Sequence, residues 1–380
     1  MRLGRYDVAV EERPSLPAFY TALTAVGAIV LALALSSFLF RSAEASLLGA
    51  YRVVFSYAFF NPHGVFATVQ RSIFLLFCTY AFLVPLRAGL WNIGLPGQVY
   101  AGGLAAFAVP VVLGAVESVP PASAGMLIIG MALGAAIAGG LIGALAGFLR
   151  ARLSVNEILV TMMLNSILFW LVAYMIKEGG VFMSPTGEGE SFKLPGALQG
   201  PLLGGIPFTA GLALAAAVLL DWLFARTALG YRIRALGENP QAARYGGIIP
   251  VTLSLLVFAL GGAFAGLAGY HYFTAVPGVY KIPGNYGYYG DLAFYGIISA
   301  LIARGSSLGA VPIAVLFAGL SLGARFAQGA LRLPFGVDYA LLGLLMMTFV
   351  ASHVAVHFRL VWRRITPSPP HPRPADAAEG

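Results

Sequence analysis

LALAAAVLL at Leu212–Leu220 and AVPIAVLFAGL at Ala310–Leu320 decide the fold class of this chain. Neither stretch alternates apolar and polar residues, as the strands of a membrane β-barrel do. Similar runs recur through the 380 residues, of which 59% are hydrophobic and only 10% are charged. Soluble domains average about 25% charged residues, and a soluble fold could not cover this much apolar surface. The sequence therefore predicts an all-α protein that crosses a membrane many times.

Apolar segments of about 20 residues, the length that crosses a bilayer, predict about ten spans, with the third one broken. Pro17–Phe40 exceeds a signal-peptide core of about 7–15 residues and is the first span. Residues 44–60 are less apolar and could lie flat at the interface. The remaining spans are expected at 67–86, 89–115, 123–149, 155–176, 205–225, 248–272, 288–303, 307–326 and 336–357.

The distribution of Lys and Arg predicts the orientation. With the N-terminus inside, the inner segments hold 15 Lys and Arg residues and the outer segments hold 8. Cytoplasmic loops carry this excess, so both termini are expected in the cytoplasm. The net charge of +8 is then topogenic, and no nucleic-acid partner is expected. The domain prediction is a cytoplasmic segment 1–16, one transmembrane domain 17–357, and a cytoplasmic tail 358–380 that is expected to be disordered.

GLWNIGLPGQ at Gly89–Gln98 is the first segment that could carry function. Its glycines and proline should interrupt a helix. Irregular backbone at membrane depth survives only inside protein or beside a water-filled cavity. Asn92 and Gln98 would then supply hydrogen-bonding groups to a substrate site, as in the broken helices of transporters. An ordinary interfacial turn before the third span explains the pattern equally well.

A second polar segment begins the fifth expected span. Glu157, Thr161 and Asn165 are spaced four apart and therefore share one helix face. Ser154 and Glu157 also fit the S-x-x-E capping box, which is the favoured interpretation of Glu157. Asn165 lies two turns inside the span, so its amide must find partners on another helix or in a pathway.

The Arg-rich linker 226–247 is expected on the inner side. Asn239 is a suitable N-cap and Pro240 a suitable first residue for a short helix over Pro240–Tyr245. Gly246 and Gly247 should end that helix. Such a helix could dock into a partner, although a simple topogenic loop has the same composition.

The outer segment Pro277–Asp291 is rich in glycine and tyrosine, and it includes Asn285 and Tyr289. Tyrosines at this place favour an aromatic belt at the membrane interface. A mouth that stacks a planar or sugar ligand is the alternative.

Several activities are not supported by any motif. No G-x-x-x-x-G-K-[ST] sequence is present, so no ATP site of the P-loop type is expected on this chain. Gly305–Gly309 matches G-x-S-x-G only formally, because it joins two apolar spans and is expected to form a turn. Asp221, His271 and Asp291 lie near span ends, where solvent should reach them. The lack of acids at span centres argues against a proton-coupled carrier.

Three segments together resemble the permease subunits of nucleoside and simple-sugar ABC importers. Gly89–Gln98 is similar to that family's G-L-F-N-I-G-x-E-G-Q, although Leu95-Pro96 replaces a small residue and Glu. Ser154–Asn165 is similar to N-E-x-x-x-T-x-M-L-N. Thr227–Ile248 is similar to T-x-x-G-x-x-x-R-A-x-G-x-N-x-x-A-A-x-x-G-I, a pattern shared with branched-chain amino acid and monosaccharide permeases.

The resemblance implies a transport subunit, not an enzyme, that moves nucleosides inward across a bacterial or archaeal cytoplasmic membrane by alternating access. It implies three partners: an ABC ATPase that binds the ATP, a second homologous permease, and an extracytoplasmic substrate-binding lipoprotein. Membrane lipid is a further expected partner. No cofactor or metal is expected on this chain. Permeases for simple sugars or branched-chain amino acids are the alternatives, followed by a stand-alone secondary carrier.

The resemblance also implies roles for individual residues. Those expected to line or shape the substrate pathway are Asn92, Gly94, Gly97, Gln98 and Asn165, to which Thr161, Asn285 and Tyr289 are added from their positions. Those expected to couple to the ATPase are Gly230, Arg234, Gly237, Asn239, Pro240, Ala242, Ala243 and Gly247.

Overall fold

The computed structural model describes residues 2–3, 6–12, 18–40, 47–116 and 121–364. The chain divides into two compact units, one formed by residues 40–342 and the other by residues 1–39 and 343–380. Each unit is a separate cluster of contacts and is described by itself.

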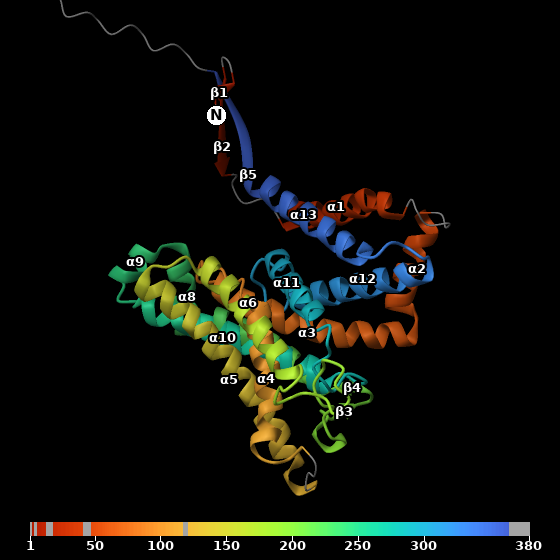
Figure 1. The fold of residues 1–380 in the computed structure, drawn as a ribbon. Coiled ribbons are helices and arrows are strands. Elements are labelled where there is room, and N and C mark those ends of the chain that lie inside the picture. Colours follow the sequence, from red (N-terminus) through yellow and green to blue (C-terminus); the bar gives the residue numbers. More distant parts are fainter. Residues whose placement is uncertain (1, 4–5, 13–17, 41–46, 117–120, 365–380) are drawn as a thin grey trace, which may run out of the picture. The chain divides into compact units, whose positions relative to one another are not determined.

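The larger unit is a bundle of helices, most of them joined by short turns, with a long connection between α6 and α7 (Figure 1). Helix α10 continues into a π-helical turn, His271–Ala275. Two short strands, β3 (Leu202–Leu203) and β4 (Ile206–Pro207), form a hairpin before α7. The helices are α2 (Leu47–Phe60), α3 (Pro62–Leu86), α4 (Leu95–Val112), α5 (Pro121–Leu153), α6 (Glu157–Ile176), α7 (Thr209–Arg226), α8 (Ala228–Glu238), α9 (Pro240–Tyr245), α10 (Pro250–Tyr270), α11 (Gly287–Ile302) and α12 (Ala310–Ala330).

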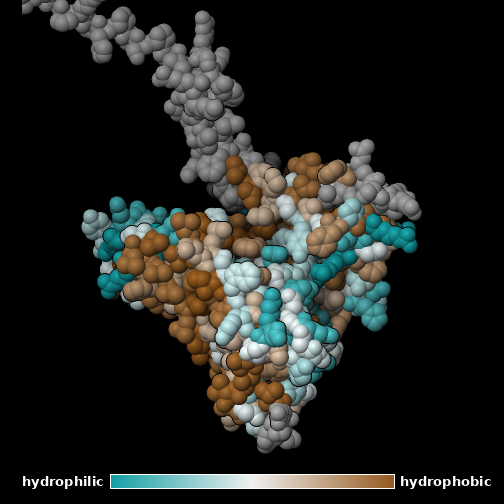
Figure 2. Space-filling view, in the orientation of Figure 1, coloured by the Kyte–Doolittle hydropathy of each residue, from teal (hydrophilic) through white to brown (hydrophobic). Residues whose placement is uncertain are grey.

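Helices α3, α4 and α10 form the centre of this unit. Helix α10 packs against α3, α4 and α5, and α3 also packs against α11 and α12. Most residues of α3 and α4 are buried, whereas most of α5 and α6 are half-buried or exposed. The exposed residues of α5 and α6 are largely Leu, Ile, Met and Trp, and Figure 2 shows this hydrophobic surface beside the hydrophilic α8–α9 end. Such a surface suits contact with lipid or with another apolar chain.

Glycines allow α5 and α10 to approach closely, as the spacing of small residues predicts. A methyl group added to Gly139 would lie 2.3 Å from the carbonyl oxygen of Gly262, and one added to Gly266 would lie 2.0 Å from that of Ala135. No side chain fits at such distances. The two backbones therefore pack directly against each other along this contact.

The smaller unit contains α1 (Ala18–Ser36) and the part of α13 (Val337–His357) that follows residue 342. The Ser352 hydroxyl donates to the Thr24 carbonyl over 3.1 Å and joins these helices. A three-stranded antiparallel sheet of β1 (Arg2–Leu3), β2 (Tyr6–Glu12) and β5 (Phe358–Arg364) also belongs to this unit. Disorder was expected from residue 358, and β5 shows that this is wrong for 358–364; residues 365–380 lie outside the described residues.

Seven helices in the described part of the chain are long and apolar enough to cross a membrane: α3, α4, α5, α6, α7, α10 with its π-helical turn, and α12. The chain is thus mostly helical, with several membrane-spanning helices, as the composition predicts. The other expected spans coincide with α1, α11 and α13, so the number ten stays a prediction, as does the orientation.

His271 is a buried polar residue of the larger unit whose two ring nitrogens both have partners. His271 was expected near solvent, but it is fully buried. Its Nδ1 lies 2.6 Å from the Thr209 hydroxyl, and its Nε2 lies 2.9 Å from the Gln70 carbonyl oxygen. The sequence prediction of an accessible His271 is therefore wrong, because α3 and α7 pack around the end of α10.

The close contact of α5 and α10 generates a stability prediction. Gly266→Ala should lower the free energy of unfolding by about 1–3 kcal/mol, because the added methyl group meets backbone that cannot move independently. The thermal midpoint of the purified protein in detergent measures this effect.

Gly211→Ala is the matched control, because the space beside Gly211 on α7 is open. It should keep or slightly raise the midpoint, since alanine favours helix. Equal midpoints for the two variants would contradict the packing argument.

Candidate functional site: a buried turn, an inner helical hairpin and an outer cavity

The third expected span, 89–115, is helical only from Leu95. Pro96 lies in the first turn of α4, where the missing proline N–H costs nothing. The glycine- and proline-rich segment therefore begins a helix instead of breaking one. The irregular backbone before it is partly buried: Asn92 is completely buried, whereas Trp91 is 40% exposed.

Asn92 and Gln98 hold this turn together. The Asn92 amide donates to Gln98 Oε1 over 2.9 Å, and the Gln98 amide donates back to Asn92 Oδ1 over 3.0 Å. Asn92 also donates to the Ala81 carbonyl at 3.2 Å and accepts from the Gly94 N–H at 3.2 Å. Each side chain thus satisfies the other and the backbone around it, as a buried polar group requires.

Helix α6 completes the turn through Asn165. The Gly97 N–H donates to Asn165 Oδ1 over 2.8 Å, and Asn165 Nδ2 donates to the Ile93 carbonyl over 3.0 Å. A methyl group on Gly97 would lie 2.9 Å from that Oδ1, and one on Gly94 would lie 3.0 Å from Thr161 Cβ. The two glycines therefore let α6 approach the start of α4. The structure brings six predicted pathway residues into one cluster: Asn92, Gly94, Gly97, Gln98, Thr161 and Asn165.

The expected capping box at the start of α6 is wrong. Asn156 is the N-cap, and its Oδ1 accepts from the N–H groups of Ile158 (2.9 Å) and Leu159 (3.4 Å). Glu157 instead forms an ion pair with Arg150, with 2.8 Å between Nε and Oε2. Asparagine and serine are similar N-caps, so the local sequence allowed both positions.

The linker that is predicted on the inner side folds into two short helices, α8 and α9. Asn239 Oδ1 accepts from the N–H groups of Gln241 and Ala242, each over 3.0 Å, and Pro240 begins α9. Gly247 follows with a φ of +79°. The predicted helix Pro240–Tyr245 and its cap are therefore confirmed, whereas α8 is an additional helix.

Two glycines of α8 lie directly against neighbouring backbone. A methyl group on Gly237 would lie 2.5 Å from the Arg87 carbonyl oxygen, and Gly237 also faces Gly89, which has a φ of +71°. A methyl group on Gly230 would lie 2.1 Å from the Leu223 carbonyl oxygen at the end of α7. Helix α8 is thus packed against both the α3–α4 turn and α7.

Arg87 joins the same turn to the connection between α11 and α12. Its Nε donates to the Gly305 carbonyl over 3.0 Å, and its guanidinium lies 5.3 Å from the centre of the Phe224 ring. Burial and the neighbouring Arg234 lower the pKa of Arg87 from its ordinary value. Residues 305–309 form the turn expected for this Gly/Ser segment, where the Gly309 N–H donates to the Ser306 hydroxyl at 3.0 Å.

The tip of the α8–α9 hairpin is exposed on the surface of the unit. Asn239, Pro240, Ala242 and Gly247 are exposed, and Tyr245 is 95% exposed. Among the other predicted coupling residues, Ala243 and Gly230 are buried, and Arg234 and Gly237 are half-buried. The hairpin therefore presents a rigid, partly apolar surface at one end of the unit.

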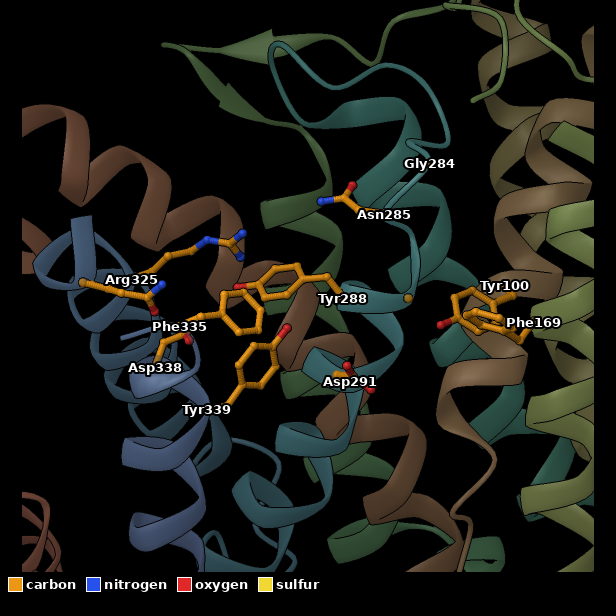
Figure 3. Close-up of a pocket in the computed structure, with 12 residues that line it drawn as sticks. Tyr100, Phe169, Gly284, Asn285, Tyr288, Asp291, Arg325, Phe335, Asp338 and Tyr339 are labelled. Atoms are coloured by element: carbon orange, nitrogen blue, oxygen red, sulfur yellow. The ribbon is translucent and has the colours of Figure 1, made fainter. Parts of the chain in front are cut away.

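A cavity of about 650 Å³ lies near the opposite ends of the helices. Figure 3 shows Tyr100 and Phe169 on one side of it, and Arg325, Phe335 and Tyr339 on the other. The lining residues come from α4, α6, α11, α12, α13 and the loops beside them: Tyr100, Phe169, Gly284, Asn285, Gly287, Tyr288, Asp291, Arg325, Gln328, Phe335, Asp338 and Tyr339.

Aromatic rings organise this cavity, which is called the outer cavity below because it includes residues of the segment Pro277–Asp291 that is predicted on the outer side. The Arg325 guanidinium lies 4.2 Å from the centre of the Tyr288 ring, a cation–π contact. The Tyr288 and Tyr339 rings meet edge to face at 5.9 Å, as do those of Tyr100 and Phe169 at 6.1 Å. Ring faces, hydroxyls and charges therefore surround one volume.

Tyr286 supports the wall formed by Phe169. Its hydroxyl donates to the Phe169 carbonyl over 2.9 Å. Burial raises the pKa of Tyr286 above its ordinary value, which keeps the hydroxyl protonated as a donor.

The outer cavity includes Asn285 but not Tyr289. Tyr289 is buried and packs on Tyr272, with 3.9 Å between ring centres, whereas its neighbour Tyr288 lines the cavity. Sequence reasoning missed Tyr100, Arg325 and Asp338. An acidic residue in the first turn of an apolar span was a usable signal for Asp338.

Sequence comparisons show which protein family the chain belongs to. A sequence model of the family described as "Branched-chain amino acid transport system / permease component" matches residues 64–350. The chain belongs to this family.

Individual relatives are permeases with different named solutes. The glucose ABC transporter permease TsgB13 of Haloferax volcanii is 29% identical over 93% of this chain and 92% of its own length. The guanosine ABC transporter permease NupP of Bacillus subtilis is 29% identical over 87% of this chain and 93% of its own length. The nucleoside ABC transporter permease NupB of Lactococcus lactis is 29% identical over 72% of this chain and 76% of its own length.

This chain is therefore an ABC transporter permease, as its sequence motifs predict. It is the transport component and a multi-pass membrane protein, and a separate ATPase hydrolyses the ATP. An ATPase and a substrate-binding protein complete such a system.

The buried turn generates a prediction for Asn165. Asn165→Leu keeps the side-chain size but leaves the Gly97 N–H and the Ile93 carbonyl without their partner. Each unpaired buried group costs about 1–3 kcal/mol. The thermal midpoint of the detergent-purified permease and its solute uptake should therefore both fall.

Ser166→Ala is the control, because Ser166 is the next residue on α6 and is exposed. It should change neither quantity. An Asn165→Leu variant with wild-type stability would mean that this link does not hold the start of α4.

Proposed function

We propose that this chain is the permease of an ATP-driven importer of nucleosides in a bacterial or archaeal cytoplasmic membrane. The outer cavity is the observation that carries the proposal. Its volume of about 650 Å³ falls in the range of small-molecule sites, about 300–1,000 Å³.

The chemistry of the cavity suits a nucleoside. The rings of Tyr288, Phe335 and Tyr339 offer faces for a planar base. Asn285, Asp338 and the other polar lining groups offer hydrogen bonds to ring nitrogens and sugar hydroxyls. The relatives NupP and NupB, named for guanosine and nucleosides, give independent support.

A simple sugar is the second candidate. Aromatic faces and polar groups also suit a sugar ring, and the relative TsgB13, named for glucose, aligns over 93% of this chain. Nucleosides are preferred because aromatic rings line both sides of the cavity.

The inner hairpin supports a route for coupling. We expect the ATPase to dock on the exposed tip of α8–α9, with a second homologous permease beside this chain. Gly237 lies against the α3–α4 turn, and that turn begins α4, which carries Tyr100 of the outer cavity. Movement of α8 would then shift α4 and alternate the access to the cavity.

Ala242→Arg tests the docking surface. Ala242 is exposed on α9, so a bulky cation there should leave the fold intact but block close contact with the ATPase. Retention of the ATPase during purification, measured by mass spectrometry, should fall at least about tenfold, corresponding to roughly 1.4 kcal/mol.

Ala197→Arg is the matched control, an exposed alanine on the segment between α6 and α7. It should retain the ATPase. Full retention by Ala242→Arg, or co-purification of no ATPase with the wild type, would contradict the docking proposal.

Competition for uptake tests the solute. Cells that express the complete transporter should take up labelled adenosine, and unlabelled guanosine should compete while excess glucose or leucine should not. Competition by glucose without competition by guanosine would favour the sugar alternative and contradict the nucleoside assignment.

A further inference from the structure

Asp338 is a buried acidic residue in the wall of the outer cavity. It lies in the first turn of α13 and is only 5% exposed, yet it lines the cavity (Figure 3). Within the described residues, its carboxylate makes no hydrogen bond and no ion pair. The carboxylate faces the cavity with Arg325 as its charged neighbour, so it is available to accept hydrogen bonds from a ligand that can donate them.

The surrounding charges restrict which ligand this is. Two carboxyl groups, Asp291 and Asp338, face the cavity, together with one cation, Arg325. The Arg325 guanidinium lies over the Tyr288 ring at 4.2 Å. The lining residues therefore carry a net formal charge of −1, and a second cation, Arg71, lies 5.7 Å from the centre of the Tyr288 ring. This lining favours neutral solutes with hydroxyl or amine donors over a phosphate.

The rings close to Asp338 indicate where the rest of the solute would lie. Tyr339 follows it in the chain, and the Phe335 and Tyr339 ring centres are 6.4 Å apart. A planar or ring-shaped solute against these faces would bring its hydroxyls toward the carboxylate. An ionised carboxylate has two oxygens and can accept from two neighbouring hydroxyls at once.

We propose that Asp338 is a specificity-determining residue that accepts hydrogen bonds from vicinal hydroxyls of the transported solute. This inference rests on the proposed function, because nucleosides and sugars both carry such a diol. The same carboxylate repels the phosphorylated forms of these solutes, so the outer cavity admits nucleosides and excludes nucleotides.

The test uses the complete transporter with its binding protein, reconstituted in liposomes, and two probes. Adenosine carries the 2′,3′-diol, and 2′,3′-dideoxyadenosine lacks it. In Asp338→Asn, adenosine uptake per unit concentration should fall at least about tenfold, because hydrogen bonds to charged groups are among the stronger ones. Uptake of the dideoxy analogue should change less than about twofold, because this analogue lacks the hydroxyls that Asp338 would bind.

Glu178→Gln is the matched control, since Glu178 is an exposed carboxylate that does not line the cavity. It should preserve the wild-type ratio of adenosine to dideoxyadenosine uptake. The binding protein is identical in all preparations, so a change in this ratio reports on the permease chain.

A purely structural role gives a different result. An acid in the first turn also stabilises a helix through its dipole, and loss of that effect would reduce the uptake of both probes equally. Equal reductions, or no reduction of either, would overturn the proposal.

The wild type tests the proposed function separately. If it carries glucose and not adenosine, the nucleoside assignment fails, and glucose with 2-deoxyglucose becomes the probe pair. A fall in the ratio of glucose to 2-deoxyglucose uptake in Asp338→Asn would still support the role of Asp338. An unchanged ratio would overturn it.

Discussion

The structure depends on one constraint: the buried polar groups of the turn before α4 must find their hydrogen-bond partners within the protein and not in water. Lipid and apolar side chains offer no hydrogen bonds there. Asn92, Gln98 and Asn165 provide them from within the protein. Their small neighbours Gly94 and Gly97 leave the space that these bonds need. This cluster fixes the start of α4 and ties α6 to it.

From this turn the contacts lead in two directions. Toward the α8–α9 end, Gly89 meets Gly237, and Arg87 binds the Gly305 carbonyl. Toward the other end, α4 carries Tyr100 into the wall of the outer cavity. A rigid helix held at its first turn is suited to transmit a displacement along its axis. The transporter mechanism proposed above needs such a connection, because ATP is hydrolysed on another chain.

Much of this was predictable from the sequence because the signals are local. Apolar runs marked the helices α3 to α7, and Asn239 with Pro240 marked α9. The polar residues of Gly89–Gln98 and Asn165 marked the buried cluster, although their mutual hydrogen bonds depend on how two helices pack. The N-cap of α6 was misplaced, since Ser154 and Asn156 both suit that role. Strand β5 was missed because it forms only with β2, more than 340 residues away. The outer cavity was only partly predicted, since Tyr100, Arg325 and Asp338 come together through tertiary packing.

The central claim is that the state of the ATPase at the inner hairpin changes access to the outer cavity. It is tested most directly by the labelling rate of Asn285→Cys with a membrane-impermeant maleimide, before and after the ATPase is trapped with ATP and vanadate. Cys78, the native cysteine of this chain, is buried and gives little background. The account predicts a labelling rate that changes several-fold on trapping, and a smaller change when Gly237→Ala is added. The same rate in both ATPase states would contradict it.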